Sequence, residues 1–247
     1  PSSKQSYGVD QKEQLMVVFG GYSNETKECF NDVHVLCAQP SLSLQRQRRK
    51  SFESLVEVSY MQPIDLASSA AADPCYQFSW RDNIIVTGEP PDPRLAHTAT
   101  ILRPRQDKGN GSVIIIFGGV GTTNIYCDVN VLDTSRLIRS DHHRSESSLD
   151  RGTNSLHWLP TVMDGRAPCP RYGHSAVALG QEIIAIFGGI AQHPLELDIF
   201  ILKLSTLRDD GVCNFSWSTI ESVSGLLPCP RSRHTSVLSF EKRSSDG

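Results

Sequence analysis

The strongest constraint on the fold of this chain is a pattern of residues that occurs three times in the same order. An apolar run ends in Phe-Gly-Gly at residues 19–21, 117–119 and 187–189. After each Phe, by 13, 11 and 11 residues, an Asp opens a second apolar run. A Trp follows, and 13 or 14 residues later comes an Arg that precedes a His by three positions. Recurrence of this kind indicates stacked supersecondary units that share one continuous core.

Each mark has an expected structural role. The Gly pair ends a strand and takes positive φ in a sharp turn. The Asp bonds backbone N–H groups and closes that turn, while the Trp packs between units. The Arg fork holds loop carbonyls or a carboxylate, and the His makes structural hydrogen bonds. The residues that carry the marks are Gly20, Gly21, Asp32, Trp80, Arg94, His97, Gly118, Gly119, Asp128, Trp158, Arg171, His174, Gly188, Gly189, Asp198, Trp217, Arg231 and His234.

The runs between the marks predict short strands and no helical repeat. Residues 113–117 and 183–187 are apolar at every position, as in strands buried on both faces. The runs that follow Asp32, Asp128 and Asp198 place branched residues at every second position, as a pleated strand does. Each unit therefore reads as four short antiparallel strands separated by turn residues.

These marks, in this order, resemble the kelch repeat family. The resemblance implies an all-β fold, a kelch-type β-propeller with about three four-stranded antiparallel blades plus the first strand of a fourth. A standard kelch unit has about 50 residues, whereas 98 and 70 residues separate the successive Phe marks. The Tyr of many kelch third strands is replaced by His34, Asn130 and Phe200. The predicted limits are a partial propeller over 1–247, with blades at 13–86, 94–163 and 171–223 and the start of a fourth at 231–240.

The excess length is assigned to three polar insertions. They occupy residues 40–75, 103–111 and 135–155, between predicted strands, where insertions are tolerated. The first contains the basic run 46–50 followed by Ser51, which reads as a possible phosphosite, a nuclear-import signal or a solvated charged loop. Closed propellers need 4–8 blades. The ring is therefore expected to be incomplete here, and remaining blades of the same parent chain, before residue 1, after residue 247 or both, are expected partners.

Net charge, hydropathy and cysteine content limit the binding partners and the cellular compartment that we expect. The net charge of −3 gives no global attraction to nucleic acid or to an anionic membrane, and no apolar run is long enough to span a bilayer. The seven Cys are odd in number and none forms a C-x-x-C pair. This favours reduced thiols in the cytoplasm or nucleus.

The sequence contains segments that partly resemble phosphate-binding, metal-binding and reactive-thiol sites, but none has the full pattern. The glycines at 118–121 are followed by a predicted strand, whereas a phosphate-binding loop needs a helix N-terminus there. His142 and His143 lie beside Asp141 in an insertion without the spacing of a metal site, and the repeat-equivalent His residues lie on different blades. Cys169 and Cys229 precede Pro-Arg and read either as reactive thiols or as turn residues, of which the turn reading is preferred. We therefore expect no catalytic residue, no metal and no cofactor.

The favoured function is a non-catalytic protein–protein interaction module, a scaffold or adaptor that binds a partner through its loops. Candidate partner-binding residues in those loops are Tyr22, Asn24, Asn124, Tyr126 and His193. The alternative is a kelch region appended to an enzyme whose catalytic domain lies outside this chain, such as a tRNA wybutosine-synthesising methyltransferase or a kelch-containing phosphatase. A propeller that is itself an enzyme is the third hypothesis, and it lacks a convergent acid, base or metal set.

Overall fold

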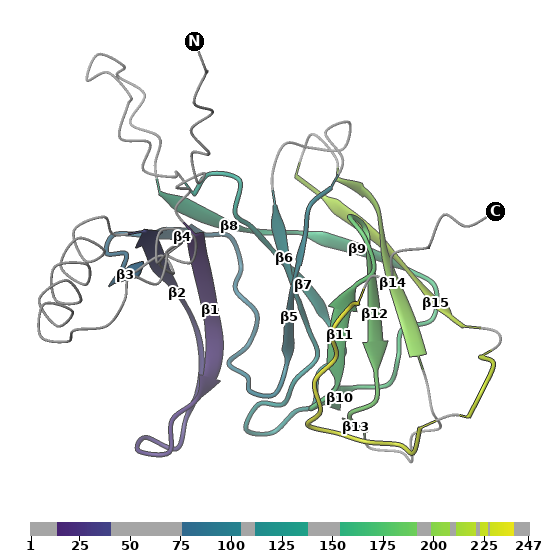
Figure 1. Ribbon diagram of the computed structural model, residues 1–247. Helices are drawn as coiled ribbons and strands as arrows, with labels where there is room; N and C mark the ends of the chain where they lie inside the picture. Colours follow the sequence, from purple (N-terminus) through teal and green to yellow (C-terminus); the bar gives the residue numbers. More distant parts are fainter. Residues whose placement is uncertain are drawn as a thin grey trace, which may run out of the picture. The chain divides into compact units, whose positions relative to one another are not determined.

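The computed structural model is built of β-strands connected by turns and loops (Figure 1). It describes residues 14–40, 76–104, 112–137, 154–191, 199–207, 211–220, 223–226 and 228–239. No helix occurs in these ranges, which confirms the all-β prediction. His193, Asp198, Ser51 and most of the three predicted insertions lie outside them. The described chain divides into two compact units, one made of residues 14–18, 34–40 and 76–82 and the other of the remaining residues.

The first repeat forms a three-stranded sheet in the order β1-β2-β3. Its strands are Gln14–Tyr22 (β1), Cys29–Pro40 (β2) and Tyr76–Trp80 (β3). Strand β3 pairs antiparallel with β2, so that Trp80 lies opposite Leu36. Strand β1 is therefore at the edge of its sheet.

The second repeat forms a five-stranded sheet in the order β4-β8-β7-β6-β5. Four of its strands run antiparallel to their neighbours, and their pairing places Thr98 opposite Phe117 and Leu132 opposite Trp158. The bounds are Ile85–Thr87 (β4), Thr98–Leu102 (β5), Val113–Phe117 (β6), Val129–Asp133 (β7) and Ser155–Leu159 (β8).

The third repeat reproduces this sheet in the order β11-β12-β14-β15-β9. Ser175 lies opposite Phe187, and Leu202 lies opposite Trp217. The Trp register is thus the same in all three repeats, and the register of the Phe mark is the same in the second and third. The bounds are Thr161–Asp164 (β9), Ser175–Ala178 (β11), Ile183–Phe187 (β12), Ile199–Leu207 (β14) and Cys213–Thr219 (β15), and a small pair is formed by Arg171–Tyr172 (β10) and Ile190–Ala191 (β13).

A fifth strand in each of these two sheets is an addition that the pattern did not predict. Strand β4 pairs parallel with β8, and β9 pairs parallel with β15. Residues 85–86 and 161–163 stand at the ends of the predicted first and second blades, and both segments hydrogen-bond to the sheet of the following repeat. After leaving one repeat, the chain thereby adds an edge strand to the sheet of the next repeat before it enters that repeat's own strands.

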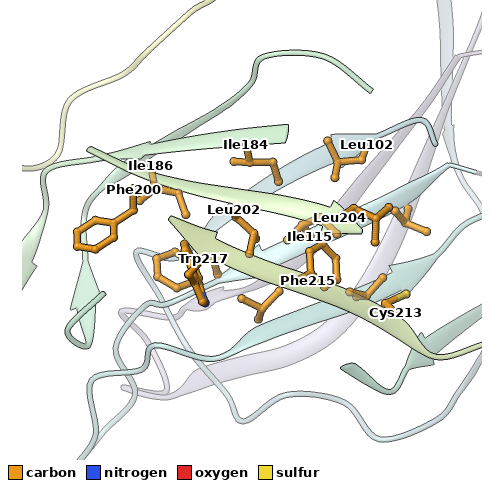
Figure 2. Packing of buried hydrophobic residues seen from close by; sticks show 14 residues of the cluster. Leu102, Ile115, Ile184, Ile186, Phe200, Leu202, Leu204, Cys213, Phe215 and Trp217 are labelled. Carbon is orange, nitrogen blue, oxygen red and sulfur yellow. The ribbon is translucent and has the colours of Figure 1, made fainter. Parts of the chain in front are cut away.

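The core lies between the sheets of the second and third repeats. Its side chains come from β5, β6 and β7 on one side and from β12, β14 and β15 on the other (Figure 2). Ile116, Val131, Leu132, Ile186, Leu202 and Leu204 have no exposed surface. Of the two strands that are apolar at every position, β6 is buried on both faces, because Ile115, Ile116 and Phe117 are at most 2% exposed. On β12, Ile184 and Ile186 are buried, whereas the alternate residues are partly exposed.

Residues 234–239, within the predicted start of a fourth blade, form no strand. A strand needs a hydrogen-bonded neighbour, and none of the described residues provides one for this segment.

Candidate functional site

The diglycine of each repeat contacts the Arg-x-x-His segment of the next repeat, and together they form a joint. In each joint the second Gly donates its backbone N–H to the carbonyl oxygen of the Arg. The three bonds join Gly21 to Arg94 at 3.0 Å, Gly119 to Arg171 at 2.9 Å and Gly189 to Arg231 at 2.9 Å. The diglycine and the Arg-x-x-His segment, which are distant in the sequence, are therefore two halves of the same contact between repeats.

Gly118 shows why the joint needs glycine. Its φ is +63°, a conformation that side chains other than glycine rarely adopt. A Cβ built on Gly118 would lie 2.7 Å from the carbonyl oxygen of Arg171 and 2.9 Å from Cε1 of His174. The sheets of consecutive repeats can approach this closely only because the first residue of the pair has no side chain.

Arg94 is fully buried and holds four groups together. Its Nε donates to the carbonyl of Asp92 and its Nη1 to the carbonyl of Gly118, both at 3.0 Å. Nη1 and Nη2 also donate to the carboxylate of Asp128, at 2.6 and 2.8 Å. The guanidinium group lies 4.0 Å from the ring centre of Tyr126, an arrangement that adds a cation–π attraction.

The charge state of Asp128 follows from these contacts. Burial tends to raise the pKa of its carboxyl group, but hydrogen bonds from Arg94 and Asn130 outweigh burial and lower the pKa below its ordinary value. The carboxylate is therefore charged at neutral pH and neutralises the buried guanidinium.

The other two arginines repeat part of this geometry. Nε of Arg171 donates to the carbonyl of Cys169 at 3.2 Å, and Nη1 donates to the carbonyl of Gly188 at 3.1 Å. Nε of Arg231 donates to the carbonyl of Cys229 at 3.0 Å. Arg171 is buried like Arg94, whereas Arg231 is exposed.

Each repeat-equivalent His lies edge-on against the Phe of the preceding repeat. The ring-centre distances are 5.3 Å for Phe19–His97, 5.0 Å for Phe117–His174 and 5.2 Å for Phe187–His234. Nε2 of His174 lies 2.9 Å from Oγ1 of Thr98, and Nε2 of His234 lies 2.8 Å from Oγ of Ser175. In both cases the hydroxyl belongs to the residue that follows the His of the preceding repeat.

These histidines are neutral at physiological pH. Burial, followed by the positive charge of Arg94, lowers the pKa of His97 to about 4. Burial and the charge of Arg171 lower the pKa of His174 to about 3. Burial also lowers the pKa of His234.

Two of the three tryptophans pack between repeats. Trp158 contacts Phe19 at a ring-centre distance of 5.3 Å, and Trp217 contacts Phe117 at 5.2 Å. They are 4% and 6% exposed, whereas Trp80 is 56% exposed and contacts His34 on the neighbouring strand. Trp80 thus has the same strand register as Trp158 and Trp217, but its side chain is exposed where theirs are buried.

The Ser–His pairs lack the features of a nucleophilic site. Oγ of Ser175 lies within hydrogen-bonding distance of Nε2 of His234 and 2.6 Å from Oγ of Ser236. A general base that activates a serine at neutral pH needs a pKa near 7 and a carboxylate that orients it. The lowered pKa values of these histidines make them weak bases, so the pairs act as hydrogen bonds between consecutive repeats. Among the described residues no cluster of His, Cys, Asp and Glu has the geometry of a metal site.

The predicted partner-binding residues lie in two equivalent loops that follow the diglycines. Tyr22 is 44% exposed at the end of β1, and Asn24 is exposed in the turn after it. Asn124 is exposed in the loop between β6 and β7, and its carbonyl accepts the N–H of Gly121 at 2.8 Å. Tyr126 is partly buried beneath Arg94, so its ring is committed to the joint.

A third element at this end of the sheets was missed by the sequence reading. The residue before each repeat-equivalent His has positive φ: 54° at Ala96, 63° at Gly173 and 56° at Arg233. The N–H of Gly173 donates to the carbonyl of Ala96 at 2.8 Å, and that of Arg233 to the carbonyl of Gly173 at 2.7 Å. These residues form a line that crosses the repeats. Gly173 was the one sequence signal for it, since the other two are residues that rarely take positive φ.

This line and the loop between β6 and β7 form one surface. The N–H of Leu95 donates to the carbonyl of Val120, and the N–H of Val120 donates to that of Leu95, each at 2.9 Å. Ala96, next to this bridge, is exposed, and so are Asn124 in the loop and Arg233 at the far end of the line. We call the set of exposed residues Tyr22, Ala96, Asn124 and Arg233 the candidate face; Gly173, between Ala96 and Arg233 in the line, is itself buried.

In the part of the chain that the structure describes, no helix has the length and hydropathy to cross a membrane.

Comparison with known proteins identifies the repeats. The model of the KLHDC2/KLHL20/DRC7 Kelch-repeats domain matches residues 75–243. The chain is 29% identical over 172 residues, 67% of its length, to the serine/threonine-protein phosphatase BSL2 of Arabidopsis thaliana. It is 26% identical over 228 residues, 92% of its length, to acyl-CoA-binding domain-containing protein 4 of the same plant. It is 30% identical over 154 residues, 60% of its length, to human host cell factor 2.

The matched regions are small parts of these relatives. They cover 14% of the phosphatase, 23% of the acyl-CoA-binding protein and 16% of host cell factor 2. What the relatives share with this chain is therefore the repeat region. Its repeats, joints and family match together show that this chain belongs to the kelch-repeat family.

Proposed function

We propose that this chain is a non-catalytic module that binds a protein partner through the candidate face. The observation that supports it most is that the Arg and His marks of the repeats are used within the joints, whereas residues of the candidate face are exposed. The side chains of Arg94, Arg171, His97 and His174 are occupied within the joints. Tyr22, Asn124 and Arg233, in contrast, are exposed. Tyr and Arg are the residue types that most often dominate binding energy at protein interfaces.

The chemistry of the buried groups agrees with a binding role. The histidines have lowered pKa values and are hydrogen-bonded to hydroxyl groups, so they do not offer a base at neutral pH. The arginines are turned toward backbone carbonyls and Asp128 and are not free for a substrate. A rigid scaffold with exposed loops is what remains, and loops on such scaffolds commonly carry binding sites.

The test is a matched pair of charge reversals. Arg233→Glu changes the candidate face, whereas Arg136→Glu changes an exposed arginine in the turn after β7, at the other end of its sheet. Each purified chain is immobilised and exposed to the same cell lysate, and the captured proteins are quantified by mass spectrometry. We expect at least one protein that binds the original chain and Arg136→Glu to lose binding to Arg233→Glu by tenfold or more.

A set of captured proteins that is the same for all three chains would contradict the proposal. Circular dichroism spectra of the variants should overlay that of the original chain, which shows that any loss comes from the surface and not from unfolding.

A kelch region attached to an enzyme is the second candidate for the parent protein. The similarity to a serine/threonine-protein phosphatase, of which the matched region is 14%, favours it. In that case the candidate face would bind within or near the enzyme, and catalytic activity would be absent from the 247 residues and present in a longer polypeptide. Assay of the 247-residue chain and the longer polypeptide with a phosphopeptide separates these cases. We also propose a cytoplasmic or nuclear location, since the described cysteines are free thiols.

A further inference from the structure

Two cysteines lie beside the joint between the second and third repeats. Cys127 directly precedes Asp128 at the end of the loop between β6 and β7, and Cys169 lies two positions before Arg171. The N–H of Arg171 donates to the carbonyl of Tyr126 at 3.0 Å, and its Nε donates to the carbonyl of Cys169 at 3.2 Å. The two segments that carry the thiols are therefore bonded to the same arginine.

The joint between the first and second repeats has the same backbone frame. There the N–H of Arg94 donates to the carbonyl of Phe30 at 3.1 Å, and its Nε donates to the carbonyl of Asp92 at 3.0 Å. Phe30 and Asp92 thus stand where Tyr126 and Cys169 stand in the second joint.

A side chain at the position of Cys127 reaches across to the facing segment. The equivalent residue in the first joint is Asn31, whose Nδ2 donates to the carbonyl of Pro91 at 3.2 Å. Pro91 directly precedes Asp92, the equivalent of Cys169. Because the two backbone frames match, the side chain of Cys127 faces the segment that carries Cys169.

The two thiols differ in their environment. Cys169 is exposed, whereas Cys127 is partly buried. Burial, followed by the charges of Asp128 and Cys169, raises the pKa of Cys127. The raised pKa keeps the Cys127 thiol protonated, which makes it a poor first target for an oxidant. The influence of Cys169 on this pKa places the two thiols close to each other.

We propose that Cys127 and Cys169 form a reversible disulfide that links the second repeat to the third. A peroxide first oxidises the exposed Cys169 to a sulfenic acid: the O–O bond breaks, an S–O bond forms, and the first water leaves. The sulfur of Cys127 then attacks the sulfur of Cys169, the S–S bond forms, and the S–O bond breaks. The hydroxyl group leaves with the Cys127 proton as the second water. A small thiol reverses the bond by exchange.

The disulfide would anchor the loop between β6 and β7 at its end. This loop spans residues 118–128, and its middle part, which includes Asn124, is exposed. In a reducing compartment disulfides are usually transient and redox-sensing, so the dithiol is the resting form and the bond forms when peroxide rises. The proposal concerns the joint, goes beyond partner binding and does not rest on the candidate face.

The third repeat supplies an internal control. Cys229 is exposed and stands in the same Pro-Cys-Pro-Arg sequence as Cys169. The residue equivalent to Cys127, one position before Asp198, is Leu197. The sequence therefore provides Cys229 with no thiol at the equivalent position.

The test treats the reduced 247-residue chain with a small excess of hydrogen peroxide at low protein concentration. The remaining thiols are blocked, and the disulfides are mapped by peptide mass spectrometry without reduction. We expect a linked Cys127–Cys169 peptide pair that has lost two hydrogen atoms and that dithiothreitol separates. Cys229 should instead form a sulfenic acid that dimedone traps.

Matched variants separate the roles of the two thiols. In Cys127→Ser the sulfenic acid of Cys169 should accumulate and react with dimedone, because the resolving thiol is absent. In Cys169→Ser the thiol of Cys127 should stay reduced at the same dose of peroxide. Cys229→Ser should form the disulfide as the original chain does.

The bond should also change stability and exchange. A disulfide restricts the unfolded chain, so the oxidised chain should melt roughly 5 °C or more above the reduced chain. The amides of residues 121–126 should exchange with solvent more slowly in the oxidised form. Both changes should be absent in Cys127→Ser.

Three results would overturn the proposal. One is oxidation of Cys169 without any link to Cys127, which means that the two sulfurs do not meet. Another is a disulfide that joins Cys169 mainly to Cys229 or to a second chain. The third is the same melting shift in Cys127→Ser as in the original chain. Partner capture with Arg233→Glu is independent of these measurements, so the two proposals fail separately.

Discussion

Arg94 binds Asp128 through both nitrogens of its fork, with Nη1 2.6 Å from Oδ1 and Nη2 2.8 Å from Oδ2. The two residues are 34 positions apart in the sequence; Arg94 lies in the loop before β5 and Asp128 directly before β7 of the same sheet. The arginine side chain is 1% exposed and that of the aspartate 43%. The pair thus keeps a buried charge neutral at the point where two blades meet.

Removal of the carboxylate charge should destabilise the fold. Asp128→Asn leaves the buried guanidinium of Arg94 without its counter-charge, and we expect a loss of about 1–3 kcal/mol, reduced by the partial exposure of Asp128. The measurement is urea unfolding followed by tryptophan fluorescence. Asp82→Asn, at an exposed position, is the control and should change stability by less than about 0.5 kcal/mol. Equal stabilities for the two variants would contradict this view of Arg94.

The joint should reject any side chain at Gly118. Gly118→Ala places a Cβ against the Arg171 carbonyl at a φ of +63°, so we expect a loss of roughly 2 kcal/mol or more. Gly180→Ala is the matched control, because nothing lies within 4 Å of its Cβ position and its φ is not in the positive range. That variant should be neutral or slightly stabilised, since alanine restricts the unfolded chain. Thermal unfolding of both variants distinguishes the two outcomes.

Stability should fall in acid because of the neutral histidines. The pKa of His174 is about 3 in the folded chain and near its ordinary 6.5 when unfolded, so the unfolded state binds the proton first. Stability therefore rises with pH between about 3 and 6.5, and this group has no effect on the pH dependence above that window. From pH 7 to pH 4 its contribution is about 2–3 kcal/mol.

The variant His174→Gln isolates this effect from the protonation of carboxylates. It removes the titrating group and keeps a polar side chain, so its stability should fall less between pH 7 and pH 4 than that of the original chain. Denaturant unfolding at a series of pH values gives both slopes. Identical slopes would mean that His174 is not held neutral in the folded state.

The cysteines should differ in reactivity. Burial, followed by the charge of Asp133, raises the pKa of Cys213 to about 12, and this thiol has no exposed surface. Cys169 and Cys229 are exposed. Brief treatment of the folded chain with iodoacetamide should alkylate Cys169 and Cys229 and spare Cys213 and Cys37, as measured by peptide mass spectrometry. Alkylation of all four at equal rates would indicate that the core between the blades opens readily.

The sequence by itself determined the repeat, the strand class and the family. The Gly pairs, the Trp and the Arg-x-x-His segments are tied to local backbone geometry and to strand period, both of which can be read along the chain. It also indicated that the Arg fork bonds carbonyls or a carboxylate, and Arg94 bonds both. The limits of the blades, and the role of the loops in binding, stay predictions.

The tertiary structure decided which marks meet. The contact between Gly118 and the carbonyl of Arg171, the line from Ala96 to Arg233, and the parallel pairing of β4 with β8 all join segments of different repeats. The sequence could not predict that Trp80 is exposed and Trp217 buried, because the two tryptophans occupy the same strand position in their repeats. The residue type predicts the position of a side chain within its own strand or turn. Its burial depends on whether a neighbouring sheet packs against it, and the packing of the sheets is decided by the tertiary structure.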